Sequence, residues 1–306
     1  MLRIALVIAA LSIPFVEVEG ASAQTLFERG PPVHRFVHRN SLALRYNPLG
    51  LIYDGRFVYR RRLYASDSTA LRDNFVSIGV APGASPAFGR IGVIAEVQPL
   101  SVLTLYAMYE VVGYFGAIGH LQSFASARSE FSDDTLDRGN EYATLGSQLI
   151  LGANVQLKIA DIVVRTQFKL IRADFDLDTG DRVFYDPFYD VLAPDGGWFL
   201  TNDADVLYQP AFGLVAGVRY TATRPFYRAA HFAPGEPRQA DNEMHRVGPL
   251  VGWAVRQRDG DPLNLLVFAA AQWWVVHRYR TGEESSAGLP MLAAGVQATG
   301  DLIPLD

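Results

Sequence analysis

The chain has 306 residues and a formal net charge of −5, and only 19% of its residues are charged. Soluble globular domains carry about 25% charged residues, so this composition is unusual for such a domain. The absence of cysteine excludes disulfides, thiolate metal sites and cysteine nucleophiles. The modest acidic charge does not fit a uniformly basic surface, so we expect no nucleic-acid partner.

Residues 1–23 have the three parts of a secretory signal peptide. Arg3 supplies a basic start, Ile4 to Val16 is an apolar stretch, and Ala21-Ser22-Ala23 is a small-residue cleavage site. The apolar stretch is shorter than the roughly 20 residues that span a bilayer, which disfavours a membrane anchor. The sequence therefore predicts that residues 1–23 are removed and that the mature protein begins at Gln24.

Alternation of apolar and polar residues dominates the rest of the chain. Leu151, Val155, Phe168 and Trp253 are expected to face outward, toward lipid, while Gln156 faces the other way. Several runs reach the roughly 9–11 residues that a tilted strand needs to cross a bilayer. No apolar run of about 18 residues follows Gln24, so we expect no transmembrane helix. We predict strands near residues 41–47, 50–64, 72–82, 87–97, 101–115, 142–157, 161–176, 203–210, 211–224, 244–257, 263–279 and 288–302.

The connections between these strands sort by length. If the N-terminus lies in the periplasm, the short connections 98–100, 158–160 and 258–262 fall on the periplasmic side, and the long connections 116–141, 177–202, 225–243 and 280–287 fall outside. Outer-membrane barrels have this asymmetry. We therefore predict an all-β, transmembrane antiparallel up-and-down β-barrel of about 12 strands over 41–302. A periplasmic leader over 24–40 and a tail over 303–306 complete the predicted organisation.

In its leader segment, its alternating strands and its turn lengths, the chain resembles Gram-negative outer-membrane β-barrel proteins in general, of a porin-like kind. The resemblance covers residues 24 to about 302 and rests on pattern rather than on a family-specific motif. It implies a place in the outer membrane, with membrane lipid and the barrel assembly machinery as partners, and leaves the oligomeric state open. One departure is the C-terminus, where such barrels commonly carry an aromatic residue and this chain ends Ile303-Pro304-Leu305-Asp306.

The less apolar face of each strand, taken as inward, gives a basic lumen. Its acids are Asp54, Glu96 and Glu110, and its basic residues are Arg45, Arg56, Arg60, Arg62, Arg90, Arg165, Lys169, Arg219, Arg246, Arg256 and Arg278. Arginines in a confined, low-dielectric pore attract anions, so the sequence predicts a small channel that prefers small anionic solutes. Two basic walls would face each other across it, with Arg165 and Lys169 on one wall. The alternative is a plugged structural or adhesive barrel with acidic external loops, whose interior is filled by hydrogen-bonded polar side chains.

The segment after residue 173 is acidic and then aromatic. Three alternating aspartates before Gly180 faintly resemble a calcium loop, although Tyr185 stands where a bidentate Glu is needed; they are Asp174, Asp176 and Asp178. A solvated loop is the preferred alternative, and no other cofactor is expected. The stretch from Phe184 to Asp190 has three interpretations: it binds sugar, it folds over the pore, or it forms a hairpin at the rim, and the rim is slightly preferred.

An enzyme is the least favoured of the three function classes. Outer-membrane lipid hydrolases use Ser and His on the outer wall of the barrel. His277 is expected on an outward face near the rim, and the segment His38 to Ser41 has suitable residue types at the periplasmic start. No G-x-S-x-G motif is present, so no catalytic residue is assigned and a lipid-modifying hydrolase stays the weakest hypothesis.

Overall fold

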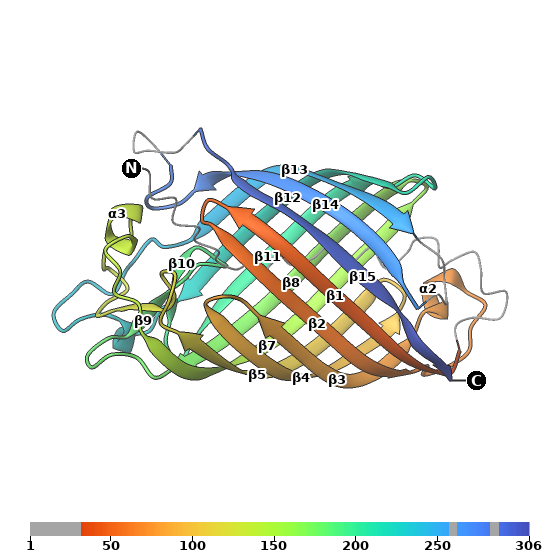
Figure 1. The fold of residues 1–306 in the computed structure, drawn as a ribbon, viewed down its shortest axis with the longest axis horizontal. Coiled ribbons are helices and arrows are strands. Elements are labelled where there is room, and N and C mark those ends of the chain that lie inside the picture. Colours follow the sequence, from red (N-terminus) through yellow and green to blue (C-terminus); the bar gives the residue numbers. More distant parts are fainter. Residues whose placement is uncertain (1–31, 257–261, 282–287, 306) are drawn as a thin grey trace, which may run out of the picture.

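A closed antiparallel barrel of twelve strands makes up most of the protein, as predicted (Figure 1). The structure is a computed structural model that describes residues 32–256, 262–281 and 288–305. Each barrel strand pairs with its neighbours in chain order, and β1 pairs with β15 to close the ring. The strands are β1 (His34–Tyr46), β2 (Gly50–Arg61), β3 (Phe75–Ala84), β4 (Phe88–Leu100), β5 (Leu103–Phe115), β7 (Ala143–Ile159), β8 (Ile162–Phe175), β11 (Gly197–Tyr208), β12 (Leu214–Phe226), β13 (Met244–Arg256), β14 (Asn264–Val276) and β15 (Met291–Leu305).

The closing pair of strands extends beyond both predicted boundaries. β1 begins at His34, which pairs with Leu305, so residues 34–40 are not part of a leader and residues 303–305 are not a tail. The ion pair between Arg35 and Asp301, 2.8 Å apart, joins the two strands near this end. A register shift after Phe36 interrupts the alternation, which explains why the sequence pattern missed this stretch.

The two faces of the wall follow the predicted alternation. The exposed fractions of Leu151, Val155, Phe168 and Trp253 are 41%, 42%, 40% and 46%, so all four face outward. Their inward neighbours are buried in the lumen, among them Ile150 and Arg165. A wall with an apolar exterior and closed strand pairing satisfies every backbone group within a bilayer, and the fold is a transmembrane β-barrel. Within the described residues, no helix has the length and apolar character needed to cross a membrane.

The connections sort to the two ends of the barrel mostly as predicted. The turn end carries the connections 101–102, 160–161 and 209–213, the end of β13 and the start of β14, and the start of β1 paired with the end of β15. It also carries one longer connection, 62–74, which holds helix α2 (Thr69–Arg72). The loop end carries the connections 47–49, 85–87, 116–142, 176–196 and 227–243 and the described residues 277–281 and 288–290, with helix α3 (Asp133–Leu136) and the short helix η1 (Ala229–His231).

A small sheet at the loop end is built from three short strands that belong to two of these connections, 116–142 and 176–196. Its order is β10 (Val191–Pro194), β9 (Val183–Asp186) and β6 (Gln122–Phe124), so two long connections pair with each other. An apolar cluster that includes Phe131, Tyr185, Leu192 and Phe232 holds this sheet to the neighbouring connections. The loop end is therefore a folded layer over the barrel mouth (Figure 1).

Candidate functional site: a lumen closed by a hairpin

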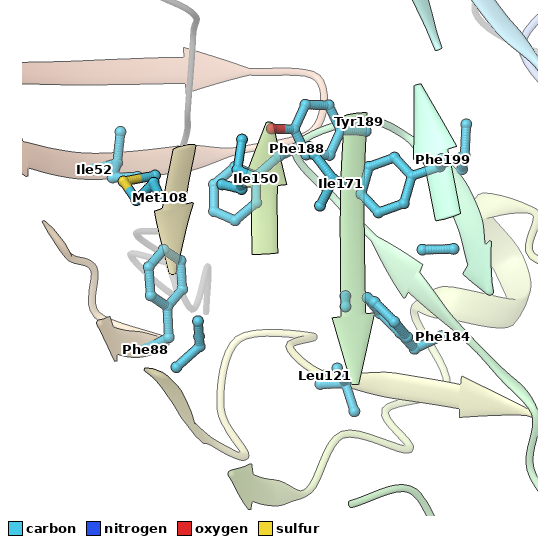
Figure 2. Close-up of a cluster of buried hydrophobic side chains, with 14 of the residues drawn as sticks. Ile52, Phe88, Met108, Leu121, Ile150, Ile171, Phe184, Phe188, Tyr189 and Phe199 are labelled. Carbon is cyan, nitrogen blue, oxygen red and sulfur yellow. The ribbon is translucent and has the colours of Figure 1, made fainter. Parts of the chain in front are cut away.

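Residues 183–194, which we name the plug hairpin, extend from the loop layer into the mouth of the barrel, and their tip lies among lumen side chains. All residues of β9 and β10 are buried, and the ring of Phe188 lies 5.4 Å from that of Phe88. Tyr189 lies 5.2 Å from Phe199 of the barrel wall. Figure 2 shows both aromatic side chains among lumen residues such as Ile150 and Ile171. The predicted hairpin exists, but it folds into the pore instead of forming a rim.

Arg45 holds the tip of the plug hairpin. This arginine is 1% exposed, and its guanidinium donates hydrogen bonds to the carbonyl oxygens of Pro187 and Phe188. A third donor reaches the carbonyl oxygen of Pro48 at 3.0 Å. Asp186 accepts hydrogen bonds from the backbone N–H groups of Phe188 and Tyr189, which fixes the turn. Arg45 was predicted to guide anions, and the structure gives its donors to the plug hairpin.

Ion pairs fill one side of the lumen between β2 and β5. Glu96 lies 3.1 Å from Arg56 and 3.8 Å from Arg60, and it also accepts a hydrogen bond from Ser77. A second set joins Arg90 to the carboxylates of Asp54 and Glu110. All of these side chains face inward as predicted. Each predicted acid thus has at least one arginine partner, which is the arrangement that the plugged alternative requires.

A third ion-pair set on the opposite side contains acids that the sequence interpretation missed. Asp205 of β11 accepts hydrogen bonds from Arg165 at 3.0 Å and from Arg219 at 2.7 Å. Asp203 lies two residues before it and accepts a hydrogen bond from Thr221. The predicted strand began only at residue 203, because the polar Asn202 sits on the outward face and masks the alternation. The strand begins at Gly197, and its i, i+2 carboxylates were the signal of an inward face.

A cavity remains between the two sides, with Tyr189 of the plug hairpin in its lining. The space in it that water-sized molecules can occupy is about 70 Å³. Four basic residues and two acids line it: Arg39, Arg56, Arg90 and Lys169, with Asp54 and Glu110. Within the described residues, Lys169 makes neither a hydrogen bond nor an ion pair. Its ammonium is therefore a cationic group that is available to a solute.

The other predicted lumen residues have different environments. Arg246 is inward and 5% exposed. Arg62 lies just past the end of β2, at the turn end, where its N–H bonds Val33. The side chain of Arg256 lies outside the described residues. Arg278 was predicted to face inward, and this prediction is wrong, because its guanidinium donates to Asn242 and to backbone carbonyl oxygens of the 116–142 connection at the loop end. That residue follows β14, where the alternation no longer applies.

The predicted calcium and hydrolase features do not assemble into sites. Asp174 is exposed at the end of β8, Asp176 and Asp178 are exposed in the following connection, and no group of three metal-binding side chains occurs in the described part of the chain. His277 is 6% exposed and bonds to the plug hairpin, so the outward position predicted for it is wrong. His38 faces outward whereas Ser41 faces the lumen, where its hydroxyl donates to the carbonyl oxygen of Asp54. These two side chains cannot act together.

Comparisons with known proteins found distant structural similarities and no related sequence. No family model and no curated protein matches the sequence. The translocator domain of autotransporter NalP from Neisseria meningitidis aligns with a TM-score of 0.40 and 8% identity, over 88% of each chain. The Pseudomonas putida toluene transporter TodX aligns with a TM-score of 0.35 and 10% identity, over 89% of this chain and 91% of its own. The outer membrane protein OprD from Pseudomonas aeruginosa aligns with a TM-score of 0.27 and 10% identity, over 92% of this chain and 96% of its own.

Proposed function

We propose that the protein is an outer-membrane channel for small anionic solutes, closed at its loop end by the plug hairpin in the structure described. The observation that carries this proposal is the cavity, where four cationic groups meet two carboxylates. Low-dielectric walls focus the field of such an excess, so a few cationic groups set the sign of the solute that enters. Arginine and lysine there would bind carboxylate or phosphate groups.

The position of the protein in the cell belongs to the same proposal. An apolar exterior with short turns at one end and folded loops at the other suits the outer membrane, with the turn end in the periplasm. The barrel would then touch membrane lipid and be inserted by the barrel assembly machinery. Residues 1–23, which lie outside the described residues, would be removed on export. N-terminal sequencing of the protein from outer membranes should then begin at Gln24.

Lys169 gives the sharpest test of the anion preference, because the chain has only one other lysine. Lys158 lies at the turn end and donates to the carbonyl oxygen of Gln209, away from the cavity. In proteoliposomes, we expect Lys169→Gln to lower the ratio of chloride flux to potassium flux, and the matched Lys158→Gln to leave it unchanged. Equal flux ratios for the parent protein and both variants would refute the role of the cavity.

A closed structural barrel is the second candidate function, and two observations favour it. Most of the inward arginines are paired with carboxylates, and the plug hairpin fills the loop end. If the refolded barrel keeps its heat-resistant, fast-migrating form on gels but passes no ions, this candidate replaces the channel.

A further inference from the structure

The carboxylate of Asp190, at the tip of the plug hairpin, lies in a pocket built mainly by the barrel. Trp274 of β14 donates its Nε1–H to Asp190 at 2.8 Å. The guanidinium Nε of Arg280 lies 3.2 Å from the same carboxylate, and the Nε2 of His277 lies 3.5 Å from it. Tyr185 of the hairpin itself adds a hydroxyl donor at 2.8 Å. Asp190 is 1% exposed, so its negative charge is fully enclosed by donors.

Three of these four donors belong to the wall or to its immediate continuation, not to the plug hairpin. Trp274, His277 and Arg280 follow one another along the end of β14 and the start of the next connection. The orientation of His277 is fixed as well, because its Nδ1 accepts the backbone N–H groups of Tyr279 and Arg280 at 3.0 Å each. Its Nε2–H then donates to the backbone carbonyl oxygen of Asp190 at 3.1 Å, beside the carboxylate. The wall therefore holds a preformed receptor for a carboxylate, and Asp190 is its occupant.

The receptor has donors that Asp190 does not use. Arg246 of β13 is 5% exposed, and its Nε and Nη1 atoms have no hydrogen-bond partner within the described structure. Its guanidinium lies 5.8 Å from the centre of the Trp274 ring, so it borders the same pocket. A buried guanidinium with unused donors is costly unless an acceptor reaches it. The Nη atoms of Arg280 already donate to Asp133, at 3.1 and 2.7 Å, so Arg246 is the guanidinium of this pocket with unused donors, and a solute with a second anionic group would supply their acceptor.

We propose that Arg246, Arg280, His277 and Trp274 form a binding site for a small dianionic solute, and that Asp190 occupies it as an internal ligand. The solute would place one anionic oxygen or group where the Asp190 carboxylate lies and present another to Arg246. Because the solute and the Asp190 carboxylate compete for the same donors, binding of the solute shifts the plug hairpin out of the lumen. This inference deepens the proposed function, since it makes the channel open in response to its own class of solute.

A cysteine probe reports whether the plug hairpin leaves the lumen. The chain has no cysteine, and Val191 of β10 is 0% exposed and close to cysteine in size. In the refolded full-length Val191→Cys protein, we expect slow reaction with a water-soluble maleimide. Succinate or inorganic phosphate should speed this reaction about tenfold, as expected for the loss of one charge-assisted contact, whereas sodium chloride at equal ionic strength should not. Response to succinate alone or phosphate alone would identify which dianion the site accepts.

Variants separate the receptor from the occupant. Asp190→Asn added to the probe should react fast without any dianion, while Asp181→Asn, in the same connection but bound to Ser123, should react slowly like the parent. Arg246→Gln should stay slow and lose its response to dianions. The inference is overturned if neither dianion changes the rate, if sodium chloride acts equally, or if Asp190→Asn is as slow as the parent. The readout is independent of ion flux, so a barrel that passes no ions but responds to a dianion would refute the channel alone.

Discussion

At the scale of single residues, pairing decides what the buried charges of the lumen do. Asp205 lies between Arg165 and Arg219 and accepts charge-assisted hydrogen bonds from both. All three side chains are at most 2% exposed, so water cannot replace a missing partner. Removing one member of such a set leaves an uncompensated charge in the barrel interior.

We therefore expect Asp205→Asn to destabilise the barrel by about 3–5 kcal/mol, because two arginines lose their counter-charge. The measurement is the urea midpoint of unfolding of the refolded protein in lipid vesicles. Asp161→Asn is the matched control, since Asp161 is exposed in the turn between β7 and β8. A midpoint for Asp205→Asn equal to that of the control would show that the two arginines do not depend on this carboxylate.

His231 links the loop layer to Asp195, the residue that directly follows the plug hairpin. It is 3% exposed, its Nδ1 accepts the backbone N–H of Arg228 at 2.8 Å, and its Nε2–H donates to the carbonyl oxygen of Asp195 at 3.1 Å. This pattern requires a neutral imidazole, because a protonated Nδ1 cannot accept. Burial lowers the pKa of His231 below its ordinary value, consistent with that neutral form.

The sign of the pH effect follows from that lowered pKa. Between the ordinary pKa of about 6.5 and the lower value in the fold, the unfolded segment binds the proton more strongly, so the loop loses stability as pH falls through this window. We expect trypsin cleavage after the exposed Arg238, normalised to a peptide substrate at each pH, to increase as pH drops below about 6.5. His231→Gln should remove most of this increase. An identical pH profile in that variant would assign the effect to another group.

At the scale of elements, the sequence predicted strand bounds best where one face of the strand is apolar and the other is polar. β7 and β8 came close to their observed bounds because apolar and polar residues alternate strictly along them. β11 was cut short because Asn202 faces outward and bonds Thr166 and the backbone of Gln167. Asp203 and Asp205 lie within the predicted strand 203–210, but they were not assigned to its inward face, and their omission exaggerated the positive charge of the predicted lumen.

The register of β7 gives a direct test of the two faces. Leu151 is the central residue of this 17-residue strand and faces outward. Leu151→Arg should impair assembly, because arginine at the midplane of a lipid face costs about 2–4 kcal/mol. Gln156→Arg, on the inward face, should assemble normally. The comparison is the yield of heat-resistant barrel after refolding into vesicles, and a reversed order of the two yields would place the register one residue off.

At the scale of the whole molecule, the plug hairpin determines whether the lumen is open. The sequence predicted the barrel, its strand number and most of the basic side chains that face inward, since these depend on local alternation, but it missed Arg39 and misplaced Arg278. Folding over the pore was one of three interpretations of the stretch from Phe184 to Asp190, but the rim was preferred, because the contacts that hold the hairpin in the barrel mouth are distant in sequence. Asp190 accepts hydrogen bonds from Trp274 and Arg280, and Arg45 donates to the carbonyl oxygen of Pro187. No local sequence pattern predicts these partners.

The inward fold of the plug hairpin also changes the meaning of the arginine excess. Arg45 and Arg280 serve the hairpin, and Arg56, Arg90, Arg165 and Arg219 have carboxylate partners. The charge left for a solute is therefore concentrated at the cavity around Lys169 and at Arg246, not spread along the lumen. A channel of this kind would be selective at two places and closed until its plug moves.

The reversal potential of the refolded mature protein in a planar bilayer, under a salt gradient, tests the proposed function most directly. We predict stepwise currents with an anion-selective reversal potential, and a smaller anion preference after Lys169→Gln. A cation-selective reversal potential, or an anion preference that Lys169→Gln leaves unchanged, would contradict the account.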